Sequence, residues 1–320
     1  MKLFFSGGDS RLFWPQSGVV ATLGFFDGVH AGHRFLIERV KAVALQCGLP
    51  STVITFSDHP RKVLSPDFEP KLLNRYGEKI TLLGKTGIEG CFVMDFTTQL
   101  SEMSAGTFIK EVLAGEFNVK ALVIGYDHRF GKNRMDGFDE YKKSGKACGM
   151  EIIQVKPLPR SGQPVSSTVI RNFLLTGNIR LANRLLGYHY NLDGCVVHGN
   201  HLGRTIGFPT ANVDWSDHYK VMPHDGIYAV WVRVDADWYK GMAYIGDRPS
   251  VALDGEKRFE VHLLDFSEEL YGSKIRIEFV DYLREDKKFD SLHDLKRQLE
   301  QDKQLTERCL KMKEMKGMKK

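Results

Sequence analysis

Cysteine is scarce in this sequence, and the spacing of the few thiols excludes two common classes of small protein. The five cysteines are scattered, and no two of them are separated by two residues. Their odd number and their scattered positions argue against a disulfide framework and against a zinc site built from thiolates. We therefore expect buried, inert cysteines in a reducing compartment: Cys47, Cys91, Cys148, Cys195 and Cys309.

Long hydrophobic runs are also missing. No segment approaches the ~18 consecutive apolar residues that a membrane span needs. The start MKLFFSGGDSRLFWP is mildly apolar, but it lacks the long apolar region and the cleavage site of a secretion signal. The sequence shows no internal repeat and no low-complexity segment. We expect a cytoplasmic protein that does not bind membranes.

The charge is not strongly of one sign. Forty-five Lys and Arg against 40 Asp and Glu give a net charge of +5. This mild excess would serve a small polyphosphate as well as a nucleic acid. The clearest charge run is the terminal KMKEMKGMKK, which favours a solvated, frayed basic tail over a nucleic-acid arm. We expect no nucleic-acid partner.

The first half of the chain alternates strand-like and helix-like segments, and 320 residues suit two domains. Strands separated by helices of this length indicate crossover connections, and thus a doubly wound parallel sheet with helices on both faces. Ser104 is a plausible N-cap of the second helix. Strands are expected at 19–25, 51–56, 90–96, 120–127 and 150–158, and helices at 33–48, 104–117 and 166–177.

After about residue 185, short β-type runs follow one another without helices between them. Gly, Pro and Asp separate the runs, which indicates an antiparallel barrel or sandwich. An amphipathic helix at 291–312 follows the strands. The domains are expected at 1–182 and 183–314, with a basic tail at 315–320. The strands are expected at 194–199, 209–215, 226–234, 238–246, 258–266 and 273–283.

The stretch GFFDGVHAGHR directly follows the first expected strand. Ligands of open parallel sheets bind beyond the carboxyl ends of the strands, and Gly24 and Gly28 let the backbone approach a ligand. His30 and His33 share one face if the next helix has begun, and both can donate hydrogen bonds to phosphate oxygens. A metal site that includes Asp27 is an alternative, but no third ligand in an i+4 pattern accompanies it. A Walker A loop is excluded because G-K-[ST] is absent.

These residues resemble the signature of the HxGH nucleotidyltransferases, in the form found in the FAD synthetase module of bacterial bifunctional riboflavin kinase/FAD synthetases. VSSTVIR at 165–171 is similar to the family's I-S-S-T-x-I-R, and IGYDHRFG at 124–131 is similar to its G-x-D-F-x-F-G. ITFSDHPRKVL at 54–64 resembles the family's second-strand segment. The resemblance spans the whole first domain in the family's order.

The resemblance implies that the first domain joins FMN to ATP with Mg²⁺, giving FAD and pyrophosphate. It assigns His30 and His33 to catalysis, and Phe56 and His59 to the flavin side. The sequence departs from the family at Asp58, where proline is frequent, and at His128, where an aromatic residue is frequent. The implied ATP contacts are Gly24, Phe25, Asp27, Gly28, Gly32, Asp127, Arg129, Ser166, Ser167, Thr168 and Arg171.

The stretch GRTIGFPTANV at 203–213 is the most specific one in the second half. Thr210 and Asn212 put two oxygen atoms on one face if the segment is extended, and hard oxygens suit Mg²⁺. Taken alone, the stretch would also fit an ordinary polar strand. It resembles the riboflavin kinase signature, and GCVVHGNHLGR, AYIGDRPSV and FEVHLLDF resemble further segments of that family in order.

This second resemblance implies that Thr210 and Asn212 bind the metal and that Glu260 is the catalytic base for the ribityl 5′-hydroxyl. From the strand pattern alone, Glu260 would be an ordinary residue that faces solvent, because its side chain points away from the side on which Phe259 and Val261 lie. Arg284 and Phe289 are expected to close over the flavin. The implied ATP contacts are Gly199, Gly203, Arg204 and Pro209.

The two resemblances imply successive steps: riboflavin and ATP give FMN, and FMN and a second ATP give FAD. We expect these small molecules to be the only partners of a monomer or weak homo-oligomer. Three alternatives stay open. The first domain would act on another phosphorylated substrate, one of the two sites would have decayed, or the chain would be a flavin- or RNA-binding regulator without turnover.

Overall fold

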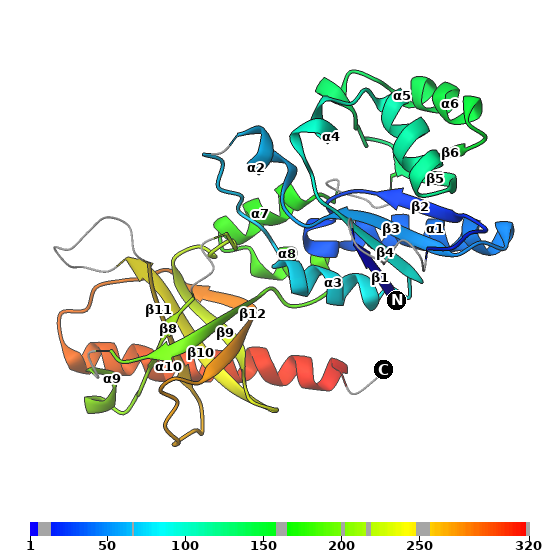
Figure 1. Ribbon diagram of the computed structural model, residues 1–320. Helices are drawn as coiled ribbons and strands as arrows, with labels where there is room; N and C mark the ends of the chain where they lie inside the picture. Colours follow the sequence, from blue (N-terminus) through cyan, green and yellow to red (C-terminus); the bar gives the residue numbers. More distant parts are fainter. Residues whose placement is uncertain are drawn as a thin grey trace. The chain divides into compact units, whose positions relative to one another are not determined.

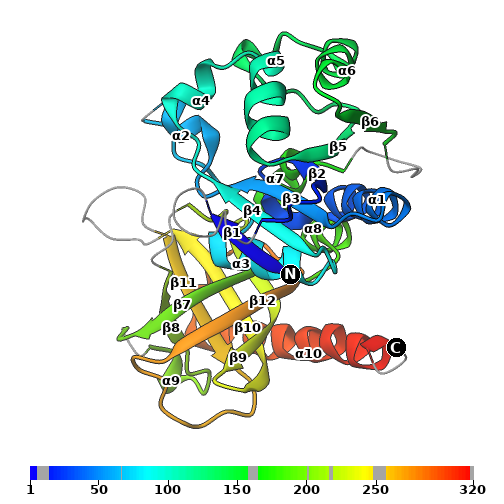
Figure 2. The same cartoon turned by 45° about the vertical axis from the view of Figure 1, so that its right-hand side comes forward.

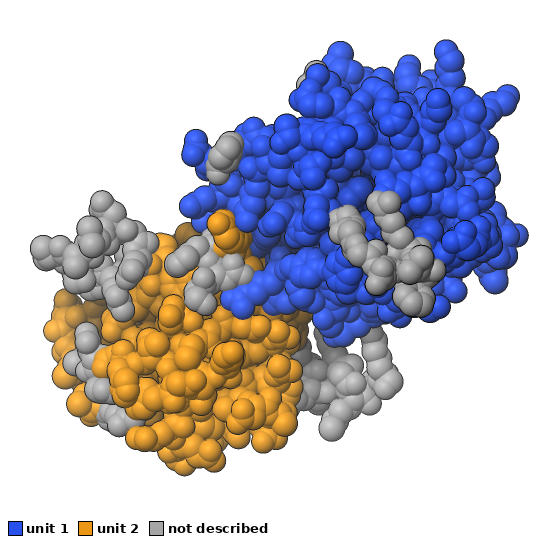
Figure 3. All heavy atoms as spheres, in the orientation of Figure 1, with its two compact units in different colours: residues 1–167 blue, residues 168–320 orange. Residues whose placement is uncertain are grey.

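The computed structural model describes residues 1–5, 14–65, 67–157, 165–199, 202–215, 219–247 and 257–317, without the side chains of Asn133, Leu202, Arg204, Asp247 and 312–317. The described chain forms two compact units, Met1–Ser167 and Thr168–Lys320 (Figure 3). The domain boundary expected between 182 and 183 stays a prediction.

Unit 1 is built on a six-stranded sheet in which every described pair of strands is parallel. The order is β1-β4-β3-β2-β5-β6 (Figure 1). The strand β1 was not expected, because four residues with a single buried side chain carry little periodicity. The strands are β1 Lys2–Phe5, β2 Val19–Leu23, β3 Ser51–Phe56, β4 Gly90–Met94, β5 Val119–Gly125 and β6 Glu151–Val155.

Side chains alternate between the two faces of this sheet, and each face has its own core. Within β2, Val19 and Ala21 belong to one core, and Val20 belongs to the other. Helices α1 (Ala31–Cys47) and α3 (Tyr76–Gly84) lie on the Val20 side, whereas α5 and α6 lie on the opposite side (Figure 2). The doubly wound fold is therefore confirmed.

The helix ends follow local capping chemistry. His30 accepts the backbone N–H of His33 at the start of α1, and Gly48 ends that helix with φ of +63°. Ser104 caps its segment as expected, because its Oγ accepts the N–H of Thr107 at 3.1 Å. The helix expected at 104–117 is present, but beyond its first turn it is a π-helix, over Phe108–Glu116. The other helices of unit 1 are α2 Pro60–Leu64, α4 Thr98–Glu102, α5 Ala105–Thr107, α6 Phe138–Ala147, and the short 3₁₀ turns η2 Asp27–Val29 and η4 Lys132–Arg134.

Unit 2 is built on a closed antiparallel barrel with strand order β10-β11-β8-β7-β12-β9, which confirms a barrel and excludes the sandwich. Aromatic rings pack inside it, with the centroids of Tyr228 and Phe279 5.2 Å apart. The strands are β7 Asn191–Val197, β8 Ala211–Asp214, β9 Gly226–Val234, β10 Asp237–Asp247, β11 Lys257–Leu263 and β12 Lys274–Arg284.

Helix α10 (Leu292–Gly317) lies along the barrel, where its Leu310 packs against Ala229 and Val280 (Figure 1). It extends beyond the expected end at 312, so part of the basic tail is helical. The remaining helices are α7 Ser167–Leu175, which begins at the last residue of unit 1, and α8 Ile179–Leu186 and α9 Leu202–Thr205 in unit 2.

The structure shows how far the cysteines are buried and whether any described helix could cross a membrane. Of the five cysteines, Cys91 alone is buried, and Cys47 is exposed, so burial is confirmed for one thiol. Within the described residues, no helix combines the length and the apolar character that crossing a membrane requires.

Candidate functional sites

The loop after β2 in unit 1 has an unusual backbone. Phe26, Gly28 and Val29 all have positive φ angles, of +56°, +82° and +37°. Positive φ costs glycine little, but it strains a β-branched residue such as valine. Arg34 donates to the carbonyl of Val29 at 2.8 Å, and Ser167 Oγ donates to the carbonyl of Asp27 at 2.9 Å. The surrounding structure thus holds the loop in this shape.

Asp27 has a structural part in this loop. Its side chain is buried, and its Oδ1 accepts the backbone N–H groups of Leu73 and Asn74 at 2.9 and 3.2 Å. A carboxylate that receives two backbone donors is held firmly in place. The expected contact between Asp27 and ATP stays a prediction.

The two histidines of the motif lie face to face. The rings of His30 and His33 stack with centroids 3.6 Å apart, and His30 Nδ1 accepts the N–H of His33 at 3.3 Å. A side chain at Gly32 would put its Cβ 3.2 Å from the His30 ring, so the ring would have to shift by a few tenths of an ångström to admit one. The spacing of three residues therefore does place both rings on one face at the start of α1.

The electrostatics keep His33 neutral near pH 7. Burial lowers its pKa well below the usual value, and repulsion from His30, Arg34 and His128 adds to this effect. Burial likewise lowers the pKa of His128 to about 4. Among the described residues, nothing hydrogen-bonds to His33 Nδ1 or to His128 Nε2, although both atoms are buried. These two nitrogens are free to bind a ligand.

Aromatic rings gather beside the ends of β2 and β3. The centroid of Phe25 lies 4.8 Å from that of His59, and Phe56 lies 5.4 Å from Phe96. His59 also contacts Phe68, at 5.3 Å. Phe25 and Phe96 both pack against the hydrophobic core that contains Phe56, and His59 contacts Phe25, so the expected residues Phe25, Phe56 and His59 lie in one aromatic cluster. The sequence did not point to Phe68 or Phe96, which lie in segments without a recognisable motif.

The other predicted nucleotide contacts lie on two segments. Asp127 and Arg129 are exposed in the loop after β5, and Arg129 donates to the carbonyl of Asp136 at 3.1 Å. Ser166 precedes helix α7, which begins at Ser167. On that helix, Arg171 lies 3.4 Å from the Thr168 hydroxyl, to which it donates. Across the described residues, no three His, Cys, Asp or Glu side chains form a group that could hold a metal ion.

In unit 2, Glu260 lies on the outer face of the barrel wall. Phe259 and Val261 on either side of it are buried inside. The strand register pairs Glu260 with Asn212 of β8 on one side and with Tyr244 of β10 on the other. Directly paired residues have Cβ atoms about 4.5–5.5 Å apart. The expected base and one expected metal ligand are therefore neighbours.

Ion pairing and glycine packing shape this face further. Arg258 Nε lies 2.7 Å from Glu260 Oε1. A Cβ at Gly199 would lie 1.9 Å from Asn212 Nδ2, and one at Gly203 would lie 2.2 Å from the Phe208 carbonyl. Only glycine can therefore bring the loop this close to the strand that carries Asn212. The side chain of the predicted ATP contact Arg204 lies outside the described residues.

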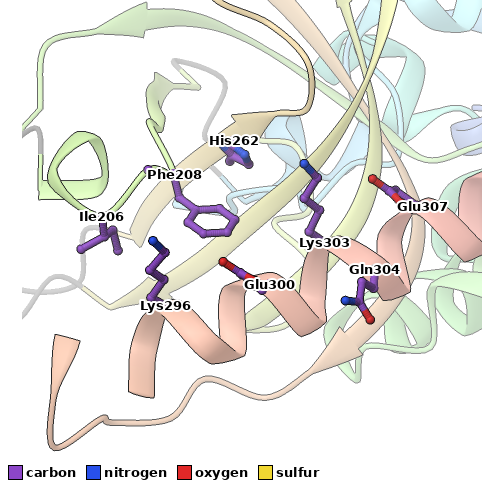
Figure 4. Close-up of a pocket in the computed structure, with 9 residues that line it drawn as sticks. Ile206, Phe208, His262, Lys296, Glu300, Lys303, Gln304 and Glu307 are labelled. Atoms are coloured by element: carbon purple, nitrogen blue, oxygen red, sulfur yellow. The ribbon is translucent and has the colours of Figure 1, made fainter. Parts of the chain in front are cut away.

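A cavity of about 440 Å³ opens on the same side of the wall. Figure 4 shows Phe208 and His262 on one side of it and side chains of α10 on the other. His262 follows Glu260 by two residues, so the two share a face, and its Nδ1 donates to the carbonyl of Pro209 at 2.7 Å. The lining residues are Ile206, Gly207, Phe208, His262, Lys296, Glu300, Lys303, Gln304 and Glu307.

Arg284, a predicted flavin contact, has other partners. Its guanidinium holds the buried carboxylate of Asp302, with Nη2 2.7 Å from Oδ2 and Nε 3.1 Å from both oxygens. It also lies 5.8 Å from the ring centroid of Phe289, the other predicted contact. The ion pair between Arg284 and Asp302 joins the end of β12 to α10. The sequence could not reveal Asp302, because a buried aspartate in a polar helix looks like any surface residue.

We expect Arg284→Ala to destabilise unit 2, because the substitution leaves the Asp302 charge buried without its cation. Breaking a buried ion pair costs about 3–5 kcal/mol. Three of the four tryptophans, Trp215, Trp231 and Trp238, lie in unit 2, so tryptophan fluorescence in urea follows this unit. Arg297→Ala is the control, since its partner Asp294 is exposed and such pairs are worth about 1 kcal/mol or less. An unchanged urea midpoint for Arg284→Ala would exclude the structural role.

Two family models match separate parts of the chain: the FAD synthetase model matches residues 13–169, and the riboflavin kinase model matches residues 186–310. Each model covers the motifs that the sequence pointed to in that half, except that the first match ends at residue 169, inside the motif at 165–171. The family resemblance inferred from those motifs is therefore confirmed.

Relatives match across nearly the whole chain. A bifunctional riboflavin kinase/FMN adenylyltransferase of Listeria monocytogenes is 37% identical over 294 residues, covering 92% of this chain and 93% of that protein. The Escherichia coli K12 protein of the same name is 38% identical over 289 residues, covering 90% and 91%. A crystal structure from Streptococcus pneumoniae, described as a macrolide-efflux protein, is 32% identical, covers 96% of this chain and 99% of that one, and has a TM-score of 0.85. The chain belongs to the bifunctional riboflavin kinase/FMN adenylyltransferase family.

Proposed function

We propose that this chain converts riboflavin to FAD in two ATP-dependent steps, with a separate nucleotide site in each unit. The observation that carries the proposal is that each unit has its own set of polar groups: the stacked His30–His33 pair in unit 1, and the Glu260–Asn212 pair in unit 2. Residues 1–182 are proposed to adenylylate FMN, and residues 183–314 to phosphorylate riboflavin.

In the kinase step, Glu260 accepts the proton of the ribityl 5′-hydroxyl. That hydroxyl oxygen forms a bond to the γ-phosphorus of ATP. The bond between the γ-phosphorus and the oxygen that bridges it to the β-phosphorus breaks, and ADP leaves. The oxygens of Thr210 and Asn212 fit Mg²⁺, and the loop backbone at Gly199 packs directly against Asn212. The metal would neutralise phosphate charge there.

The cavity beside α10 is proposed to receive the flavin ring of riboflavin. Its volume of about 440 Å³ is within the range of small-molecule sites. Phe208 offers an aromatic face, and His262 links the cavity wall to Pro209, next to Thr210. A ring bound here would lie on the face of the barrel that carries Glu260.

In the adenylylation step, an FMN phosphate oxygen attacks the α-phosphorus of ATP, and pyrophosphate leaves. No proton has to be removed from the attacking phosphate dianion, and no covalent enzyme intermediate is needed. His30 and His33 donate N–H groups to the phosphate oxygens on which charge builds up. Because the His33 ring is stacked on His30, its donor is held in place before the substrate binds.

The remaining parts of the proposal concern the setting. Riboflavin, FMN and ATP are proposed as the only partners, and the chain is proposed to work in the cytoplasm as a monomer or weak homo-oligomer. The mild net charge of +5 supports polyphosphate substrates without requiring a nucleic acid.

The Mg²⁺ assignment can be tested with Thr210→Ala. We expect the Mg²⁺ concentration for half-maximal riboflavin phosphorylation to rise about tenfold, which corresponds to about 1.4 kcal/mol, because one oxygen ligand is lost. Thr210→Ser should restore the wild-type value, and the Mg²⁺ titration of FMN adenylylation should not move. An unchanged kinase titration for Thr210→Ala would remove Thr210 from the metal site.

The overall function is tested by incubating the purified chain with riboflavin, ATP and Mg²⁺ and separating the flavins by chromatography. FMN should accumulate first, and FAD should follow. Absence of both products, together with oligonucleotide binding that weakens steeply with salt, would favour the regulator without turnover.

A further inference from the structure

A lysine lies buried under the aromatic cluster of unit 1, although no step described so far uses it. Lys79 is in the middle of α3, and its residue is only 3% exposed. Its Nζ donates to the carbonyl of Phe56 at 2.8 Å and lies 4.1 Å from the ring centroid of Phe25. One ammonium group therefore contacts the end of β3 and the residue that follows Gly24 after β2.

Charged and titratable groups surround Lys79 from several elements. Asp27 of η2, Asp58 after β3, Cys91 of β4 and Tyr76 of its own helix all face it, the Tyr76 ring at 5.9 Å. Asp27 and Asp58 favour the charged form. Burial raises the pKa values of Cys91, to about 12, and of Tyr76, so neither group ionises below pH 9.

Burial outweighs these carboxylates and lowers the pKa of Lys79 to about 8. The lysine is therefore charged at neutral pH and becomes neutral as the pH rises through 8. Because an unfolded lysine keeps its proton up to about pH 10.4, the folded state binds fewer protons than the unfolded state between these values. Stability should thus rise with pH across this window, which means that the buried charge is a cost to folding.

A costly buried charge next to Phe25 and Phe56, a predicted ATP contact and a predicted flavin contact, calls for a role other than stability. An apolar side chain of similar size would fill the space without the desolvation penalty. The ammonium group fixes the distance between the Phe25 ring and the Phe56 carbonyl. It holds the ring by a cation–π contact and the carbonyl by a charged hydrogen bond. Both partners are predicted substrate contacts, since the family resemblance assigns Phe25 to the ATP and Phe56 to the flavin.

We propose that Lys79 is a positioning residue for FMN adenylylation, whose ammonium group fixes Phe25 against the end of β3 and so sets the spacing between the nucleotide side and the flavin side of the site. The inference rests on the proposed adenylyltransferase function of unit 1. It adds a residue that does not touch the reacting atoms and acts through Phe25 and Phe56.

The first test is the pH profile of the full chain. The rate of FAD formation from FMN should fall as the pH rises through about 8. The pH profile of riboflavin phosphorylation should be the same for the wild type and for Lys79→Met. Lys79→Met should lower kcat/KM for FAD formation about ten- to hundredfold at pH 7, because small displacements in a positioned site cost that much. Its profile should lack the inflection at pH 8.

Two comparisons separate positioning from a structural role. Thermal unfolding of Lys79→Met should occur at the wild-type temperature or above it, because a buried charge has been removed. Lys79→Arg should retain more activity than Lys79→Met at pH 7 and lose less of it above pH 8. Lys85→Met, an exposed substitution at the end of the same helix, is the matched control and should change neither activity.

The outcomes that overturn the inference are distinct from those that overturn the function. If the wild-type chain makes no FAD at pH 7, the adenylyltransferase function fails. If it makes FAD but its rate does not fall around pH 8, or if Lys79→Met keeps both rate and inflection, the positioning role fails. Should Lys79→Met not fold, the wild-type profile and Lys79→Arg still decide.

Discussion

Glu260→Gln is expected to lower kcat for riboflavin phosphorylation about 10²- to 10⁴-fold, the contribution typical of a positioned general base. Glutamine keeps the size of the side chain, so the strand pairing with Asn212 and Tyr244 should survive. It cannot accept the proton of the 5′-hydroxyl. FAD formation from added FMN should stay near the wild-type rate, because the adenylylation site is in unit 1.

The measurement is the steady-state rate of each step, with the flavins separated by chromatography. Glu278→Gln is a matched control, because Glu278 is on strand β12 of the same barrel, which does not pair with β11, and it pairs with His189 at 3.3 Å, not with a site residue. If Glu260→Gln phosphorylated riboflavin at the wild-type rate, Glu260 would be only the outward-facing residue that its strand pattern indicates. If it lost both activities equally, the assignment of one step to each unit would be wrong.

The second large effect is expected for His33→Ala, which should lower kcat for FAD formation about 10²- to 10³-fold, the typical cost of removing one preorganised donor to a transition state. His33 is neutral, its ring is stacked on His30, and its Nδ1 has no hydrogen-bond partner among the described residues. The loss should appear in kcat more than in KM for ATP, since the donor acts on the charge that builds up during transfer.

Release of pyrophosphate from FMN and ATP measures this step directly, and riboflavin phosphorylation by the same variant is the internal control. Thermal unfolding of His33→Ala should show that α1 still forms, because His30 and not His33 supplies the side-chain cap of that helix. A variant that binds ATP more weakly but turns over at the wild-type kcat would place His33 in ground-state binding alone.

The sheet and the barrel were largely predictable because their strands are short apolar or alternating runs between turn residues. The expected strand at 51–56 coincides with β3, and all six residues are buried. Helix α3 was not expected, since its buried face includes Lys79, which a hydrophobic pattern counts as polar. Helix α6 was missed for a related reason: Tyr141 and Gly145 are its buried residues, and lysines fill much of the rest.

In the candidate sites, the sequence predicts arrangements of residues that are close in the chain, but not contacts between residues that are far apart in it. The placement of His30 and His33 on one face follows from a spacing of three residues at the start of a helix, so the sequence alone predicts it, whereas the stacking of their rings is seen only in the structure. The pairing of Glu260 with Asn212 joins residues 48 positions apart, and only the register of the closed barrel brings them together. Asp302 under Arg284 is likewise a long-range contact that no local pattern indicates.

The central claim is that the two steps use two independent sites, and mixing the two variants tests it most directly. Alone, Glu260→Gln should make neither FMN nor FAD from riboflavin, and His33→Ala should stop at FMN. Equal amounts of the two variants, given riboflavin, ATP and Mg²⁺, should form FAD, because FMN released by one protein is a substrate for the other. A mixture that accumulates FMN without FAD, or forms no flavin product, would contradict two independent sites.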